Sequence, residues 1–316
     1  MTTQADKSLL VPEKWWELPE YQEPELYLPG QSRLDEEGNR LLELTASKAA
    51  CGNLHLPPMP EAAREAVRLL SSDDAEIEEI ATALNKDPAL TAHVLAHANS
   101  ALYGAASIID TTGHALSFLG LRRTQGIIMQ AALKHAAQEI GNRLYAAMEW
   151  RHSIFCANIA RRLGKLAGVD PEQCYTAALL HDIGRIPILH TLNANDALPP
   201  QPSDDDRHEI ILEVIHRGVG VQMAEAWKLP PAVKDAIKSH VNGRLPDEES
   251  LAQYPSTRVV EAASDLCIAL GLGCIKRPFA VLKAPSFQGL GASEDELIGF
   301  CDRELPVIIS DVSEIA

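Results

Sequence analysis

Apolar residues recur at helical spacing along most of this chain of 316 residues. Between residues 61 and 70, for example, Ala62, Ala66 and Leu69 share one face of a helix. Alternating runs of Val, Ile and Thr, which would predict strands, are almost absent. Aromatic residues make up only 5% of the chain, so Leu, Ile, Val and Ala must fill the core, and that composition suits packed helices. The sequence therefore predicts an all-α fold.

Proline positions and composition divide the chain into four parts. Four prolines before residue 30 exclude a long helix there, and the adjacent Trp15 and Trp16 predict an extended arm that packs on the body of the protein or on a partner. The parts are an acidic N-terminal arm (1–33), an N-terminal helical part (34–135), a helical core (136–272) and an acidic C-terminal extension (273–316).

Three segments of the second half lack a clear helical pattern. Residues 192–207 and 243–255 are rich in proline and acidic residues, which predicts solvated loops. Past Gly273 the pattern loosens, and we expect a short helix near residues 294–296 and a tail over 305–316.

The charge balance limits the kinds of partner. Lys and Arg total 28 against 44 Asp and Glu, a formal net charge of -16. Such a field repels phosphate backbones, which disfavours broad electrostatic binding to nucleic acid or to an anionic membrane. A local basic pocket for a small anionic ligand is still compatible with this charge.

The six cysteines include no CxxC pair, and most of them fall on apolar helix faces. The first residues are polar rather than an apolar signal segment, and no stretch approaches the roughly 20 apolar residues of a membrane span. These features predict reduced thiols and a cytoplasmic protein.

The dipeptide His181-Asp182 stands at the end of an apolar run. An imidazole and a carboxylate are both costly to bury unless something pairs with them, and a divalent metal is a common partner. The pair therefore predicts a metal-centred site that either carries phosphohydrolase chemistry or is derived from one.

Four further residues fall on the apolar sides of other predicted helices: His152, His216, His240 and Asp265. A single histidine on an apolar face is more often a core residue bonded to a carbonyl oxygen than a ligand. Six such groups on five helices favour shared coordination of one or two ions, and nitrogen with carboxylate ligands suits Zn, Fe or Mn. The remaining histidines are expected at the surface or locally bonded: His55, His93, His97, His114, His135, His190 and His208.

Seven short motifs follow one another in order between about Leu54 and Leu272. They are Leu-Pro-Pro-Met-Pro at 56–60, Asp-Pro-Ala-Leu-Thr at 87–91 with Asn-Ser-Ala-Leu-Tyr-Gly at 99–104, Ala-Leu-Ser-Phe-Leu-Gly at 115–120, Trp-Arg-His-Ser at 150–153, Leu-Leu-His-Asp-Ile-Gly-Arg at 179–185, His216 with Gly220, and Trp-Lys-Leu-Pro at 227–230 ahead of His240. In this order the motifs resemble the HDOD domain, the HD-related output domain of bacterial signalling proteins. The resemblance covers about two thirds of the chain.

The resemblance implies an HD-like helical array with an additional N-terminal helical subdomain, related to HD phosphohydrolases. It also implies ligand roles for the six candidate metal residues: His152, His181, Asp182, His216, His240 and Asp265. Arg185 stands where a basic residue can hold a phosphate. Two features differ from two-metal HD enzymes: Val241 replaces a second histidine after His240, and the Gly-Tyr-Pro signature of one such group is absent.

Two functions follow from the resemblance. HDOD domains generally act as regulatory modules, which implies a non-catalytic signalling protein whose pocket binds metal and reports it to a signalling partner. An anionic, phosphate-containing molecule is a further candidate ligand of that pocket. The alternative is a phosphohydrolase or phosphodiesterase acting on a nucleotide or cyclic nucleotide. In that case Asp182 and Asp265 would position metal and water, and Arg185 would stabilise phosphate charge.

Overall fold

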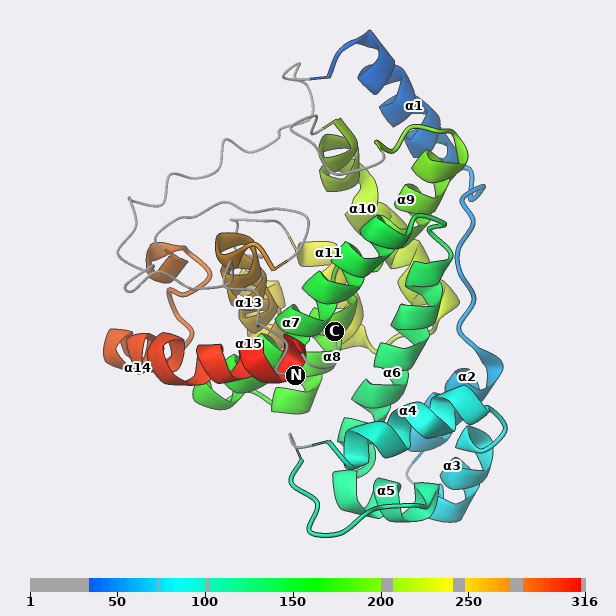
Figure 1. Cartoon of the computed structure of the whole chain (residues 1–316). Coiled ribbons are helices and arrows are strands. Elements are labelled where there is room, and N and C mark those ends of the chain that lie inside the picture. Colours follow the sequence, from blue (N-terminus) through cyan, green and yellow to red (C-terminus); the bar gives the residue numbers. More distant parts are fainter. Residues whose placement is uncertain are drawn as a thin grey trace, which may run out of the picture.

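The structure is a computed structural model that describes residues 34–72, 74–100, 103–199, 207–240, 248–272 and 281–313 (Figure 1). Within these ranges the chain forms helices and no strand, so the predicted all-α class is confirmed. The predicted arm over residues 1–33 lies outside the described residues. Among the helices of these ranges, none combines the length and the apolar character that crossing a membrane requires.

Four short helices gather around the first half of a long one, at the lower right of Figure 1. A proline in the first turn and an aspartate N-cap start one of them: Asp87 Oδ1 accepts from the backbone N–H groups of Ala89 and Leu90. The helices are α2 (Glu61–Leu70), α3 (Ile77–Leu84), α4 (Pro88–Ala98), α5 (Thr112–Leu119) and the long α6 (Leu121–Gln138).

The core of the second half is a helical hairpin with helices packed around it. Asn142 and Asp170 cap the two hairpin helices, α7 (Arg143–Leu166) and α8 (Pro171–Leu180). Around them lie α9 (Arg185–Ala194), α10 (Arg207–Ala226), α11 (Pro231–Ser239), α12 (Glu248–Gln253) and α13 (Ser256–Leu270). The first helix, α1 (Glu36–Ala50), packs on α9 and α10 at the top of Figure 1, away from α2–α5.

The C-terminal extension is more ordered than the sequence predicts. It contains η3 (Val281–Lys283), α14 (Glu294–Gly299), a π-helical segment η4 (Phe300–Glu304) and α15 (Leu305–Ser313). The expectation of a tail from residue 305 is wrong, because Leu305, Ile308 and Val312 are buried and α15 packs on α7. The expectation of a continuous loop over 243–255 is also wrong, since α12 lies within it.

Candidate metal centre

The His181-Asp182 pair lies in the turn that joins α8 to α9, with His181 at the C-cap of α8. Gly184 in the same turn touches the backbone of α10: a Cβ at position 184 would overlap the His216 oxygen and the Gly220 nitrogen. Gly220 in turn allows α11 to approach, because a Cβ there would lie 2.6 Å from Ile237 Cγ2. The two glycines therefore bring the turn, α10 and α11 into direct contact.

Four imidazoles point their Nε2 atoms at the Asp182 carboxylate. His152 and His181 lie 3.6 and 3.5 Å from Oδ2, and His216 and His240 lie 3.6 and 3.7 Å from Oδ1. The side chains come from α7, the α8 C-cap, α10 and the α11 C-cap. We call these five residues the His/Asp cluster. The structure thus brings together five of the six candidate ligands.

Hydrogen bonds fix the orientation of three of the rings. Nδ1 of His181 contacts the Ala178 oxygen at 2.6 Å, and Nδ1 of His216 contacts the Leu212 oxygen at 2.8 Å. Nδ1 of His240 contacts Glu261 Oε1 at 2.9 Å. Because each acceptor requires a proton on Nδ1, the neutral form of each ring carries its lone pair on Nε2, facing Asp182. Metal-ligating histidines are oriented in this way.

One buried atom of the cluster lacks a partner. His216 Nε2 is buried and, within the described residues, makes no hydrogen bond. Leaving such an atom unpaired costs about 1–3 kcal/mol. Four imidazole nitrogens around one carboxylate are the ligand types that Zn, Fe and Mn accept, and His216 Nε2 would then be satisfied. The donor set therefore fits a divalent transition metal.

Burial and neighbouring charge set the ionisation of the cluster. Burial lowers the pKa of His181 to about 3, so this imidazole is neutral. Burial opposes the charge of Asp182, but His181, His240 and His216 hold the pKa of its carboxyl well below the usual range. Burial also opposes the charge of His240, yet Glu261 and then Asp182 raise its pKa to about 10. Asp182 is thus a carboxylate at neutral pH, ready to act as a ligand.

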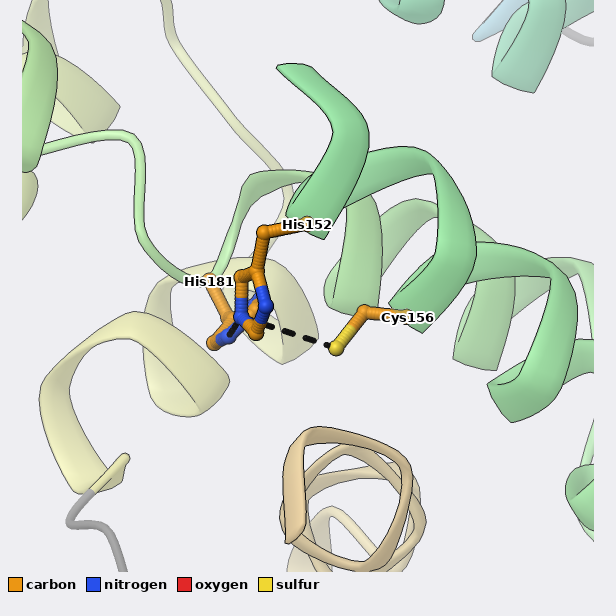
Figure 2. Close-up of side chains that lie close together, drawn as sticks. All are labelled: His152, Cys156 and His181. Atoms are coloured by element: carbon orange, nitrogen blue, oxygen red, sulfur yellow. Dashed lines mark hydrogen bonds between the residues drawn. The ribbon is translucent and has the colours of Figure 1, made fainter. Parts of the chain in front are cut away.

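Two residues that the sequence analysis did not single out as site residues border the cluster. Cys156 lies one turn after His152 on α7, and its Sγ is 3.7 Å from His152 Nε2; Figure 2 shows both side chains with His181. Burial raises the pKa of this thiol well above its usual value, and Sγ also contacts Cys267 Sγ at 3.5 Å. Glu261 binds His240 from α13. Spacing of four residues, His152 to Cys156 and Glu261 to Asp265, is the signal that could have identified them.

Arg185 is buried among carboxylates. Its Nε lies 3.0 and 3.1 Å from the two carboxylate oxygens of Glu149, and its terminal nitrogens lie 2.8 Å from Glu209 and 3.6 Å from Glu213. Only 4% of Arg185 is exposed. The guanidinium is therefore already neutralised, and phosphate would have to displace one of these glutamates.

Asp265 lies on α13, and its carboxylate accepts a hydrogen bond from Ser286 Oγ at 2.5 Å. Burial raises the pKa of Asp265 to about 7. Groups whose ligand atoms all lie within 4.8 Å of one another are His152, Cys156 and His181, and His181, Asp182 and His240. Of the six candidates, Asp265 is the one that makes no hydrogen bond or ion pair with another candidate within the described residues.

Little space adjoins the cluster. His181, His216 and His240 are at most 3% exposed, whereas the side chains of His152 and Asp182 are 12% and 10% exposed. A cavity beside Asp182, lined among others by Glu149 and Ser153, is too tight for a phosphate ester. Among the described residues, the His152–Asp182 edge is therefore the most exposed part of the cluster.

Two histidines expected at the surface or locally bonded are buried elsewhere. His97 Nδ1 contacts the His93 oxygen at 2.9 Å, in keeping with the local bonding expected of it. His208 stacks edge-on against Tyr145 with ring centres 5.3 Å apart. Five cysteines lie in the described residues, and all of them are free thiols; Cys274 lies outside these residues.

The family model of the HDOD domain matches residues 56–242, which include all five residues of the His/Asp cluster. A curated protein from Treponema pallidum (strain Nichols), described only as uncharacterized, is 24% identical over 204 residues. That alignment covers 59% of this chain and 38% of the relative, so the chain spans well under half of its length.

Three solved structures share the fold. An HDOD domain protein of unknown function from Geobacter sulfurreducens has a TM-score of 0.65 and 24% identity, covering 86% of this chain and 97% of its own. A candidate signal transduction protein from Marinobacter aquaeolei VT8 scores 0.64 at 21% identity, covering 90% and 66%. A candidate metal-dependent phosphohydrolase from Shewanella amazonensis SB2B scores 0.59 at 20% identity, covering 88% and 94%.

Proposed function

Because this chain belongs to the HDOD domain family, we propose that it is a regulatory protein of a signalling system whose His/Asp cluster binds a divalent transition metal without catalysing hydrolysis. The observation that carries this proposal is the convergence of four Nε2 atoms within 3.7 Å of one buried carboxylate. An arrangement of this kind supplies a preformed ligand set for an ion.

The two oxygens of Asp182 face different pairs of histidines, which supports one or two ions. Oδ2 faces His152 and His181, and Oδ1 faces His216 and His240. A bound ion would supply positive charge and Lewis acidity at this carboxylate. By binding the same ion or pair of ions, the residues of the His/Asp cluster would connect α7, the α8–α9 turn, α10 and the end of α11.

Three features favour a non-catalytic role. Arg185 is paired with glutamates, so it offers no uncompensated charge to a phosphate. Asp265 is bonded to Ser286 and makes no hydrogen bond or ion pair with the His/Asp cluster within the described residues. The cavity beside Asp182 is also too small for a phosphate ester. In this proposal metal occupancy sets the packing of four helices, and a signalling protein senses that packing.

A phosphohydrolase is the second candidate, and one observation favours it. The side chains of His152 and Asp182 keep 12% and 10% of their surface exposed, so a water molecule could reach the cluster along this edge. Small movements of α7 would then be needed to admit a nucleotide.

Metal analysis combined with hydrolysis assays separates the two candidates. The protein is purified under gentle reducing conditions, its metal content is measured, and bis(4-nitrophenyl) phosphate and a cyclic dinucleotide are tested with added Mn or Fe. We expect at least one ion per chain, its loss in Asp182→Ala, and no hydrolysis above the metal alone. The exposed Asp295→Ala is the matched control and should retain metal.

Each other outcome contradicts a specific part of the proposal. Hydrolysis by the parent that disappears in Asp182→Ala would establish the phosphohydrolase instead. Protein that retains no metal under these conditions would contradict both candidates.

A further inference from the structure

A second cavity, of about 780 Å³, lies beside the C-terminal half of α7. Its walls come from segments far apart in the sequence: the end of α5, the start of α6, α7, the start of α8, and α15. Ligand pockets for small molecules typically have volumes of about 300–1,000 Å³. The cavity is therefore large enough for a molecule of nucleotide size.

The lining is basic, in contrast to the rest of the chain. Two carboxylates, Glu172 and Asp311, face this lining, within a chain whose net charge is -16. Five cationic side chains line it: Arg122, Arg123, Arg161, Arg162 and Lys165. Concentrating this many cations around one cavity of an acidic protein creates a local site for an anion.

Two of the arginines are held in place by a single glutamate. Glu172 accepts from Arg123 Nε at 3.1 Å and from Arg161 Nη2 at 2.8 Å. The Arg161 guanidinium also lies 3.8 Å above the Tyr175 ring. Its buried Nε has no hydrogen-bond acceptor within the described residues. Arg161 is thus held in a fixed orientation, with 13% of its side chain exposed.

The other cations are weakly engaged. Arg122 pairs with Asp170 with three quarters of its side chain exposed, and Arg162 lies 3.7 Å from Glu304. Lys165 is exposed and has no ion pair within the described ranges. Exposed pairs of this kind contribute about 0–1 kcal/mol, so an anion could take these cations from their present partners at little cost.

The N-terminus of α6 adds a partial positive charge to that of the arginines. Helix α6 begins at Leu121 after Gly120, which provides no side-chain cap for the first-turn N–H groups, and both residues line the cavity. The positive end of this 18-residue helix therefore opens onto the same space as the arginines.

The rest of the wall is apolar. Leu119, Leu121, Ile308 and Val312 contribute to it, and Tyr103 adds an aromatic ring. An inorganic ion alone would leave this surface uncovered, whereas a ligand with an organic part would bury it. Because Ile308 and Val312 belong to α15, the C-terminal helix is one wall of the cavity.

We propose that this basic cavity binds a phosphorylated small molecule of nucleotide size carrying at least two negative charges. The proposal goes beyond the metal-dependent function, since no residue of the His/Asp cluster lines the cavity. Arg161 follows His152 by nine residues on α7, which is about 14 Å along the helix. Extended nucleic acid is disfavoured by the acidic remainder of the surface.

Calorimetric titration of the full chain at low salt tests the proposal, with ADP, pyrophosphate, orthophosphate and adenosine as probes. We expect saturable binding of ADP, weaker binding of pyrophosphate, and none of adenosine. The double variant Arg162→Glu/Lys165→Glu should bind ADP at least about tenfold more weakly. Arg143→Glu, an exposed arginine in the first turn of the same helix, is the matched control and should bind like the parent.

A further arm separates this site from the metal centre. Asp182→Ala should bind ADP as the parent does, even if the variant has lost its metal. Loss of ADP binding in an Asp182→Ala protein whose circular dichroism spectrum matches the parent's would move the ligand to the His/Asp cluster and overturn the proposal. It is also overturned if ADP does not bind, if adenosine or orthophosphate binds as tightly as ADP, or if only an RNA oligomer binds.

Discussion

Helix α7 carries two polar sites that are built in opposite ways. The His/Asp cluster is almost completely buried, and each of its four Nε2 atoms lies 3.5–3.7 Å from an oxygen of Asp182. The basic cavity is bordered by long, mostly exposed side chains that are spread over a volume of about 780 Å³. The difference is one of preorganisation: backbone contacts fix the first site, whereas solvent and flexible side chains surround the second.

The two sites should therefore respond differently to substitution. When a residue of the cluster is replaced, its buried polar neighbours are left without a hydrogen-bond partner. Each unpaired group then costs about 1–3 kcal/mol. Charges around the cavity are partly screened by water and contribute less individually. Single substitutions should thus have large effects at the cluster and graded effects at the cavity.

The largest expected effect comes from Gly184→Ala. The added Cβ would overlap the backbone of α10 at His216 and Gly220, so the turn carrying Asp182 must move. We expect a loss of about 3 kcal/mol in the free energy of unfolding of the metal-free protein. Urea unfolding measures this value, and metal content measured in parallel should fall.

Gly218→Ala is the matched control for that substitution. Gly218 lies on α10, and a Cβ there would meet no atom within 4 Å. Alanine is a better helix former than glycine, so we expect a gain of up to about 1 kcal/mol. A Gly184→Ala protein as stable as Gly218→Ala would contradict the close approach that we assign to the turn.

Glu261→Gln should have the next largest effect, this time on metal affinity. Glu261 orients the His240 ring and increases its basicity through the 2.9 Å contact with Nδ1. Loss of such support typically costs 10–100-fold in metal affinity. Competition against a chelator of known affinity measures the change. Binding of ADP should be unaltered, and a parallel loss at both sites would indicate general unfolding.

Metal binding should also depend on pH, through His240. Its pKa in the metal-free protein is about 10, so between pH 7 and 9 the ring must release a proton before Nε2 can bind an ion. Affinity should therefore rise by at least about tenfold per pH unit in this window. Chelator competition at pH 7, 8 and 9 measures the slope, and a flat profile would contradict it.

The free energy of unfolding of the metal-free protein should fall as the pH rises, whereas the metal affinity rises. The folded pKa of His240 lies above its unfolded value of 6.5, so this group contributes stability below pH 6.5 and loses it as the pH rises toward 10. Glu261→Gln should weaken both trends, because Glu261 is the main group that raises the pKa.

The contrast between the sites also explains what the sequence could predict. The helices and the cluster histidines follow from local periodicity: His152 and His216 fall in apolar stripes that face the core. The order of α15 was missed because its stripe is short and acquires its partner only when it packs on α7. Local patterns thus predict which residues point inward but do not identify their partners.

Contacts between residues far apart in the sequence account for the features that the sequence did not predict. The sequence predicts phosphate binding at Arg185 but does not predict its ion pairs, because Glu149 and Glu209 lie 36 and 24 residues away in the sequence. The basic cavity is assembled from residues between Tyr103 and Val312. No local spacing signals such an assembly, so the sequence permitted a basic pocket without indicating its place.

Glu172→Gln should have the smallest effect, and it should strengthen ADP binding at the cavity rather than weaken it. Glu172 now occupies donors of Arg123 and Arg161, and it competes with any anion for them. Replacing it with a neutral amide removes one negative charge from the lining, so ADP should bind about threefold more tightly, a gain of less than about 1 kcal/mol. Metal affinity should not change. Titration calorimetry at two salt concentrations measures the gain, which should shrink as salt rises because the screening length falls.

Weaker ADP binding in Glu172→Gln would mean that this glutamate is needed to hold the two arginines in place. The cavity would then resemble the His/Asp cluster in its dependence on fixed geometry.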